Sequence, residues 1–366
     1  MDTQSVHSRF GAAGLMMKRR VSLAILAIVL VGLAYAVVAS SGCGSQHYFS
    51  TTTELMGVAF PDRDHAWVVD DGPTIRASTD GGSSWTEQKS GGQWTPWAVA
   101  FANAKQGWVV GATTLDINGK PLGGDVNIIL ATTDGGATWK QQPSGTDSEL
   151  DDVACVDATH AWAVGGIPAD GVILATTDSG ASWKRQLLSN KGGLEAVAFA
   201  DRRHGWAVGW SLIVGTTDGG VTWRTQISAA HYRFFDVAGA GTEHAWAIGV
   251  DDSDNRSVIL GTTDGGEKWK LLYSTSDVVL SSVAFADAVH GWVVGSGGTI
   301  LATTDGGRSW RRQPSGTTIG LNHVAFADTT HGMVTGNKIE GDDPIAGKLD
   351  GSILLRTTDG GATWQR

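Results

Sequence analysis

Residues 283–310 read VAFADAVHGWVVGSGGTILATTDGGRSW. Three short apolar runs, VAF, GWVVG and TILAT, are separated by Asp, Gly and Ser, the residues that favour tight turns. A Trp then opens a further polar segment after the turn. The stretch therefore predicts four short antiparallel strands joined by turns.

This unit occurs seven times in the sequence. Nine positions always separate the Val of the VAF-type phrase from the Trp or Met of the second strand. Nineteen always separate the Asp of the last turn from the next unit's Val, and the units repeat every 40–54 residues. Short strands at this period predict an all-β fold, a seven-bladed β-propeller of four-stranded antiparallel blades over residues 47–366. HYFSTTT (47–53) is expected to complete the last blade, because the chain stops soon after Asp359.

All variation in length falls in the loop between the second and third strands. The long examples are residues 112–127, 166–171, 250–257 and 337–351. In a propeller these loops share one face with the connections between blades, here called the variable face. Loops on a rigid scaffold commonly carry function, so we expect the binding surface on this face.

The N-terminus predicts export. Residues 1–20 form a basic n-region ending in KRR, and residues 21–38 are an apolar signal or transmembrane segment. Residues 39–46 are a short linker that contains Cys43. The sequence is compatible with two kinds of membrane anchor. One is an uncleaved membrane span, and the other is a lipoprotein signal with a lipidated Cys43. Either one predicts an extracytoplasmic domain anchored to the cell membrane.

The composition of the chain argues against one class of partner, nucleic acids. The chain has 366 residues and a net charge of −10, without a basic run outside the N-terminus, so nucleic acid is not expected as a partner. The second cysteine, Cys155, takes a slot held by Phe in most units and is expected to be buried. A Cys43–Cys155 disulfide is the weaker alternative.

One aspartate recurs in every unit, in the phrase S/T-x-D-x-G-x-x-W, which resembles the Asp-box repeat of bacterial neuraminidases. One Asp beside glycines does not supply the several oxygens of a calcium site, so we expect it to cap its own turn. A His that recurs before the second strand, replaced once by Gln106, is expected to cap a turn as well. No metal, cofactor or catalytic residue is predicted. The repeated aspartates are Asp80, Asp134, Asp178, Asp218, Asp264, Asp305 and Asp359.

Together the repeats and the export signal resemble the photosystem II stability/assembly factor family over residues 47–366. The resemblance implies a non-catalytic scaffold, expected to be monomeric, that binds a protein partner, which can be a membrane protein. In photosynthetic members it also implies a basic binding patch, whereas this chain is acidic.

A glycosidase is the alternative, because sialidases also carry Asp-boxes on propellers. Such an enzyme needs an arginine triad and a Tyr with a Glu partner, and the Arg-Ile-Pro signature is absent. Any glycosidase activity would have to use carboxylates at the mouth of the ring.

Positions that differ between units are the candidate binding residues. The two residues before each VAF-type phrase vary most, and they begin the innermost strands. The acidic candidates are Asp151, Asp152, Glu195 and Asp236. They could bind a cation, or a basic or sugar ligand. The alternative is that they only form a solvated acidic rim. The aromatic candidates for binding a protein are Trp94, Trp97, Trp210, Tyr232 and Phe235.

Overall fold

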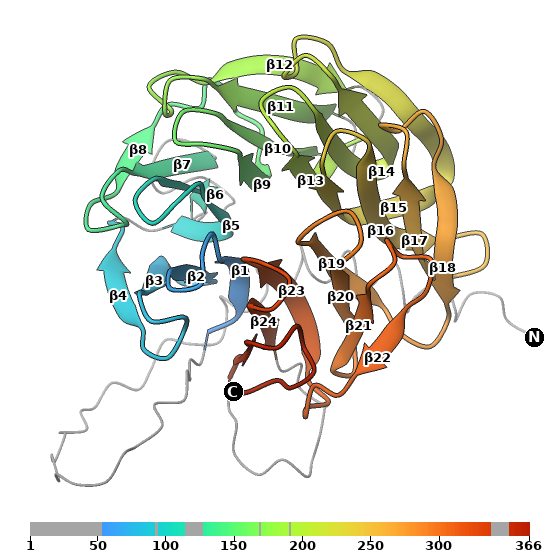
Figure 1. Ribbon diagram of the computed structural model, residues 1–366. Coiled ribbons are helices and arrows are strands. Elements are labelled where there is room, and N and C mark those ends of the chain that lie inside the picture. The colour runs from blue at the N-terminus through green and yellow to red at the C-terminus, as the bar shows by residue number, and fades with distance from the viewer. Residues whose placement is uncertain (1–52, 92–93, 114–126, 168–169, 190–191, 338–350) are drawn as a thin grey trace, which may run out of the picture. The chain divides into compact units, whose positions relative to one another are not determined.

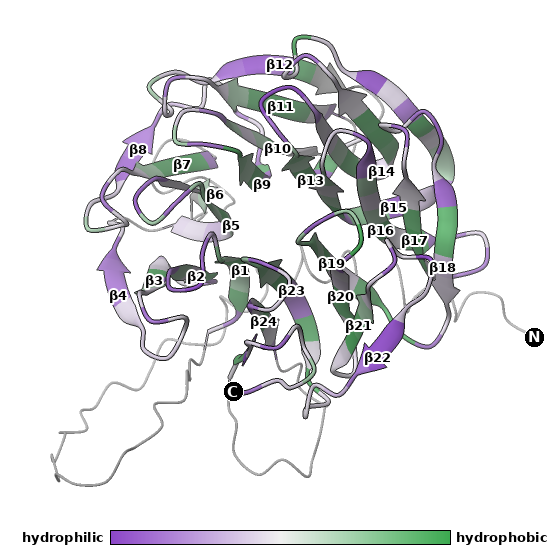
Figure 2. Cartoon of the chain, viewed as in Figure 1, coloured by the Kyte–Doolittle hydropathy of each residue, from purple (hydrophilic) through white to green (hydrophobic). Residues whose placement is uncertain are grey.

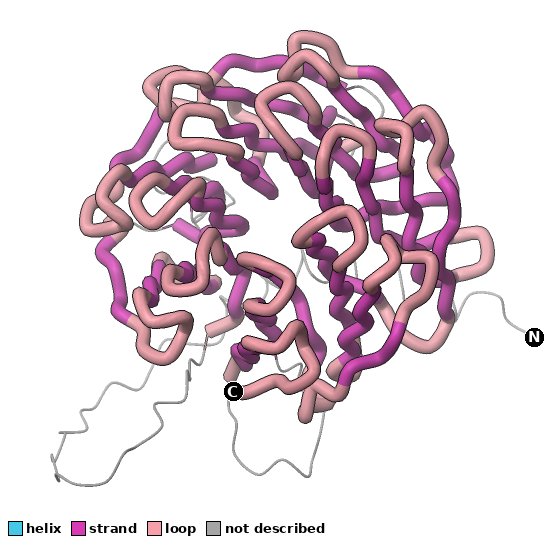
Figure 3. The backbone as a smooth tube through the Cα atoms, viewed as in Figure 1, coloured by secondary structure: helices cyan, strands magenta, loops and turns pink. Residues whose placement is uncertain are grey.

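The computed structural model describes residues 53–91, 94–113, 127–167, 170–189, 192–337 and 351–366. The chain divides into two units, Met1–Gln46 and His47–Arg366, and every described residue belongs to the second. Strands and turns make up this part of the chain, which contains no helix (Figure 3). The all-β class is therefore confirmed.

The sixth repeat shows how one unit folds. Its strands are β19 (Leu280–Phe285), β20 (Gly291–Gly295), β21 (Thr299–Thr303) and β22 (Arg311–Gln313), paired antiparallel in that order (Figure 1). All five residues of β20 are buried, whereas β22 is polar and largely exposed. A polar outer strand keeps the edge of the sheet from pairing with other chains.

Four-stranded sheets of the same kind come from the first three repeats. Their strands are β1 (Leu55–Ala59), β2 (Ala66–Asp70), β3 (Thr74–Ser78) and β4 (Thr86–Lys89); β5 (Trp94–Phe101), β6 (Gly107–Thr113), β7 (Asn127–Thr132) and β8 (Lys140–Gln142); and β9 (Leu150–Cys155), β10 (Ala161–Ile167), β11 (Asp170–Thr176) and β12 (Lys184–Ser189).

The prediction of seven blades is wrong, because the described strands form six sheets. The fourth and fifth repeats share one six-stranded sheet. Its strands are β13 (Leu194–Phe199), β14 (Gly205–Thr216), β15 (Arg224–Ala240), β16 (His244–Asp251), β17 (Arg256–Thr262) and β18 (Lys270–Thr275).

The physical cause lies in the link between these two repeats. β14 turns at Ser211, where φ is 61°, and its second half pairs with the start of β15. β15 then continues without a break into the inner strand of the fifth repeat. Backbone pairing of Trp210 with Arg233 joins the two repeats into one sheet.

The last repeat has three strands, β23 (Gly320–Phe326), β24 (Gly332–Asn337) and β25 (Ile353–Thr357). A single bridge, Arg356 with Gln365, stands where other repeats have an outer strand. The expected contribution of residues 47–53 to this blade falls almost wholly outside the described residues.

The inner strands form a closed series. β1, β5, β9, β13, β15, β19 and β23 each lie against the next, and β23 lies against β1. Asn337 secures this last junction, because its side chain accepts a hydrogen bond from Leu55 N and donates one to Leu55 O. On the other side of the same junction Arg63 pairs with Asp328 at 2.6 Å.

An aromatic stack fills the space between neighbouring repeats. Six second strands carry a Trp that is fully or almost fully buried, and four of these stack on the Phe that ends the next repeat's inner strand. The centroid distances are 3.4–3.5 Å, for Trp67–Phe101, Trp162–Phe199, Trp246–Phe285 and Trp292–Phe326. These contacts make the core a chain of clusters between sheets.

Two repeats lack that Phe. Cys155 stands in the slot beside Trp108, and Gly239 stands beside Trp206. The buried indole N–H groups of Trp108 and Trp206 have no hydrogen-bond partner. The four stacked tryptophans, in contrast, each donate to a glycine carbonyl in the turn after the third strand of the next repeat. Cys155 is half-buried and free, and burial raises the pKa of its thiol to about 12.

Hydropathy follows the same arrangement. Apolar residues dominate the inner and middle strands, and polar ones dominate β4, β8, β12 and β22 (Figure 2). No helix in the described part of the chain is long and apolar enough to cross a membrane. The predicted anchor (residues 21–38), Cys43 and most of the loops 112–127 and 337–351 lie outside the described residues.

Candidate functional site

The repeated aspartates bind their own turns. Asp134 Oδ1 accepts hydrogen bonds from Thr132 Oγ1 (2.8 Å) and Thr138 N (2.9 Å), and its Oδ2 accepts from Thr138 Oγ1 (2.7 Å). These donors lower the pKa of Asp134 to about 2. The other six aspartates each accept the same two bonds to Oδ1. Their oxygens thus serve the backbone of a hairpin.

Five of the six recurring histidines contact an Asp three positions earlier. His204 Nδ1 lies 3.0 Å from Asp201, which also accepts from His204 N. The same contact occurs at His65, His160, His290 and His331. No group of three or more His, Cys, Asp or Glu side chains in the described residues could hold a metal ion.

Each inner strand carries a β-bulge at the positions that vary most between repeats. The register shifts there in all seven repeats. The bulged residues include four candidates, Trp97, Asp151, Glu195 and Phe235, all of them half-buried. A bulge redirects a side chain without breaking the sheet, so this position can change between repeats while the ring stays intact.

Asp152 and Asp236 follow the bulge and hold neighbouring repeats together. Asp152 Oδ2 accepts a hydrogen bond from Val197 N of the next repeat at 2.9 Å. Asp236 Oδ2 accepts from Val283 N and from Ser282 Oγ, both at 2.8 Å. These two candidates therefore bridge inner strands.

Burial gives the two carboxyls unusual acidities. Desolvation raises the pKa of Asp152 to about 7, and repulsion from Asp236 adds to this increase. Desolvation raises the pKa of Asp236 to about 6 as well. On a nearby inner strand, desolvation lowers the pKa of His323 to about 4, so this imidazole is neutral at pH 7. A positively charged neighbour is not among the causes of any of these shifts.

A second group of candidates meets where the fourth and fifth repeats fuse. Trp210 Nε1 donates to Glu195 Oε1 at 2.8 Å. The Arg233 guanidinium lies 5.8 Å from the centre of the Trp210 ring and forms two hydrogen bonds with Asp252, at 2.7 and 2.8 Å. We call Glu195, Trp210, Arg233 and Asp252 the 210–233 cluster. These four residues come, in that order, from an inner strand, from a hairpin turn, from the connection between the two repeats and from a loop on the variable face.

The structure separates the aromatic candidates. Tyr232 is half-buried beside the cluster, 5.5 Å from the Phe234 ring. Trp97 and Phe235 occupy bulges of two different inner strands, β5 and β15. Trp94 is only 2% exposed and its Nε1 donates to Gly91 O, so it belongs to the core and not to a binding surface.

Sequence reasoning missed two residues of the cluster and a repeated glutamine. Arg233 and Asp252 are 19 positions apart, and no local motif marks them as partners. The glutamine follows five of the seven repeated Asp residues by eight positions, a signal that the spacing did contain. It donates to a carbonyl in the next repeat's turn and accepts from that repeat's Trp Nε1, at Gln88, Gln142, Gln186, Gln226 and Gln313.

Comparison with known proteins gives the family. The family profile described as photosynthesis system II assembly factor YCF48 matches residues 92–193, 192–276 and 272–366. The chain belongs to this family. No match was found among curated proteins.

Solved structures of the family share the fold. YCF48 bound to D1 peptide is 20% identical, with a TM-score of 0.62 over 85% of this chain and 95% of that one. YCF48 from Cyanidioschyzon merolae is 19% identical, with a TM-score of 0.62 over 86% and 98%. An ancestral GH74 enzyme is 12% identical, with a TM-score of 0.52 over 88% of this chain and 56% of the enzyme. At these identities each likeness concerns the fold alone.

Proposed function

We propose that this YCF48-family chain is a non-catalytic scaffold that binds a protein partner through its variable face. The observation that carries the proposal is the 210–233 cluster. Its Trp210 ring is held in place by Glu195 on one side and by Arg233 on the other. An aromatic side chain fixed in this way can contact a partner with little loss of conformational entropy. That a solved relative is bound to a D1 peptide supports a protein partner.

The partner surface is expected to be basic. Asp251, Asp252 and Asp254 lie in or beside the loop next to the cluster, and the whole chain carries a charge of −10. Arg233 is already neutralised by Asp252 at 2.7 Å. Complementary charge speeds the encounter of two proteins and fixes their orientation.

Capture of the partner from detergent-solubilised membranes tests the proposal. The double variant Trp210→Ala, Tyr232→Ala should lose the captured protein. The control variant Val221→Ala should retain it, because Val221 is 80% exposed and lies in a turn at the opposite end of the strands. Equal capture by all three proteins would contradict a binding site at the cluster.

We further propose that the propeller is extracytoplasmic and membrane-tethered through residues 21–38 or a lipidated Cys43. The basic residues before the apolar run support this orientation. Detergent phase separation of cell fractions tests the anchor, and Cys43→Ala separates its two forms. A protein that partitions into the aqueous phase before any substitution would refute tethering.

A glycosidase is less well supported. Asp152 and Asp236 both have raised pKa values, about 7 and about 6, as a catalytic acid can have, but their oxygens accept hydrogen bonds from neighbouring backbone. We expect no turnover of glycosides. Turnover that disappears in both Asp152→Asn and Asp236→Asn would overturn the non-catalytic proposal.

A further inference from the structure

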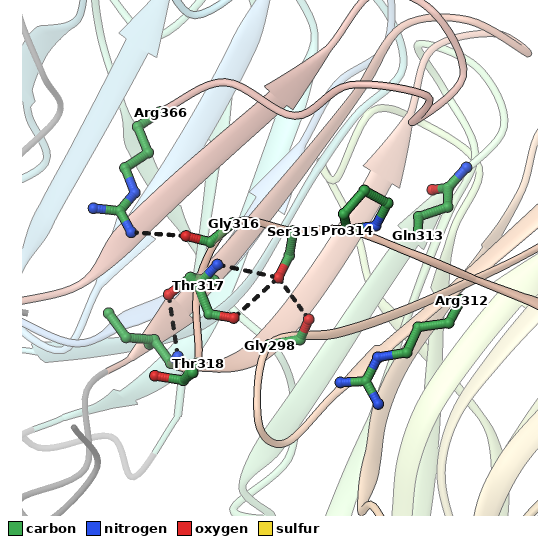
Figure 4. Close-up of a pocket in the computed structure, with 10 residues that line it drawn as sticks. Gly298, Arg312, Gln313, Pro314, Ser315, Gly316, Thr317, Thr318 and Arg366 are labelled. Carbon is green, nitrogen blue, oxygen red and sulfur yellow. Dashed lines mark hydrogen bonds between the residues drawn. The ribbon is translucent and has the colours of Figure 1, made fainter. Parts of the chain in front are cut away.

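A pocket of about 390 Å³ lies on the variable face of the sixth repeat, away from the 210–233 cluster. One wall is the turn between β20 and β21, which includes Gly298. The other is the segment Pro314–Ile319, which connects β22 to β23. Ser315 fixes the two walls together, because its Oγ hydrogen-bonds to Gly298 O at 2.7 Å (Figure 4).

Two arginines line this pocket, and the lining contains no acidic residue. Arg312 comes from β22 and Arg366 follows β25, and Figure 4 shows their guanidinium groups on opposite sides of the Ser315 hydrogen bonds. Each donates one long hydrogen bond to a carbonyl, at 3.4 Å for Arg312 and 3.3 Å for Arg366. Within the described residues, neither arginine forms an ion pair with an Asp or Glu side chain.

Several arginines elsewhere in this acidic chain are neutralised by aspartates. Arg63, Arg202 and Arg233 each form an ion pair with an Asp at 2.6–2.7 Å. The guanidinium groups at the pocket thus keep most of their planar N–H donors for a ligand. The Thr317 hydroxyl accepts from Ile319 N at 3.1 Å and can still donate its own hydrogen.

We propose that this pocket binds an oxyanion of the carboxylate class. Guanidinium groups match carboxylate oxygens in geometry and carry a permanent positive charge. The carboxylate can come from a free dicarboxylic acid or from an acidic side chain of a bound protein. The inference does not depend on the 210–233 cluster, because the two sites share no residue.

Isothermal titration calorimetry on the full chain in detergent, at low salt, tests the pocket. The probes are succinate, the peptide Gly-Gly-Glu-Glu-Gly-Gly and its Gln-Gln counterpart, with both peptides acetylated at the N-terminus and amidated at the C-terminus so that only Glu side chains supply carboxylates. At least one carboxylate probe should bind and the Gln-Gln peptide should not. Binding of succinate alone would assign a free acid, and binding of the Glu-Glu peptide alone would assign an acidic segment.

Variants decide whether the arginines are responsible. Arg312→Gln and Arg366→Gln should each weaken binding at least tenfold. Arg224→Gln, at an exposed arginine that also follows a repeated Trp, should leave it unchanged. Trp210→Ala should leave it unchanged as well, which separates this inference from the proposed function. No binding of either carboxylate probe, or equal binding by Arg312→Gln, would overturn the proposal.

Discussion

Single side chains decide how firmly neighbouring repeats are joined. The glutamine at the third position of the outer strand bridges to the next repeat in five places. In the fifth repeat Leu272 stands at that position. Its Cδ1 lies beside Gly307, whereas a glutamine amide lies beside the equivalent glycine at the other junctions that have the glutamine. The Trp310 indole N–H is consequently buried without a partner. An unsatisfied buried donor destabilises a fold by about 1–3 kcal/mol.

Restoring this glutamine should therefore stabilise the protein. Leu272→Gln is expected to raise the free energy of unfolding by about 1 kcal/mol, because Trp310 gains an acceptor. Urea denaturation of the wild type and the variant measures the difference. The reverse substitution in the preceding repeat, Gln226→Leu, should lower stability by a similar or larger amount. A Leu272→Gln variant less stable than the wild type would refute this explanation.

The carboxyls of Asp152 and Asp236 predict an unusual dependence of stability on pH. The folded pKa of Asp152, about 7, lies above the value of about 4 expected in the unfolded chain. A raised folded pKa contributes stability that is present at low pH and is lost as the pH rises through 7. Asp236 acts in the same direction near pH 6. Stability should therefore increase between pH 8 and pH 5.

Denaturation curves at pH 5, 6.5 and 8 check this expectation. Asp152→Asn should make the free energy of unfolding depend less on pH, because the titrating group is removed. This holds even if the substitution also changes the stability by a constant amount at every pH. Below about pH 4 the trend should reverse, since turn aspartates such as Asp134 have a folded pKa of about 2 and lose their bonds on protonation. An unchanged profile in Asp152→Asn would contradict the assignment.

At the scale of elements, the Trp–Phe stack joins each second strand to the next repeat's inner strand. Phe101 is 7% exposed, lies parallel to Trp67 at 3.5 Å and meets Trp139 edge-on. Cys155 occupies the equivalent slot in the third repeat with a much smaller side chain. The two positions thus provide a matched pair in one molecule.

Truncation at these two positions should have different effects. Phe101→Ala should lower the free energy of unfolding by about 3–4 kcal/mol, because it leaves a cavity beside Trp67. Cys155→Ala removes one sulfur atom and should lower it by about 1 kcal/mol. Thermal or urea unfolding of both variants gives the comparison. Equal losses would show that the stack adds nothing to this junction.

Sequence periodicity predicted the strands, the turns and the buried Trp positions, because short-range patterns encode them. It did not predict that the fourth and fifth repeats share a sheet, since that depends on the pairing of Trp210 with Arg233 across a connection. Asp152 and Asp236 lie in the inner strands β9 and β15. Their bonds to Val197 and Val283 involve a different repeat in each case, which no local pattern reports.

At the scale of the whole propeller, the seven repeats of the described residues lie on six sheets, so at one place in the ring two neighbouring repeats share a sheet. That place is the fused junction, where the 210–233 cluster lies on the variable face. The repeated Asp and Gln side chains are engaged in holding the ring, whereas the bulged positions are free to differ between repeats. Binding at the fused junction is therefore the central claim.

Site-specific photo-crosslinking in intact cells tests this claim most directly. Benzoylphenylalanine is incorporated in place of Tyr232 in one protein and in place of the exposed Val221 in another. We predict a crosslinked protein partner from position 232 and none from position 221. A partner crosslinked from position 221 but not from position 232 would contradict binding at the cluster.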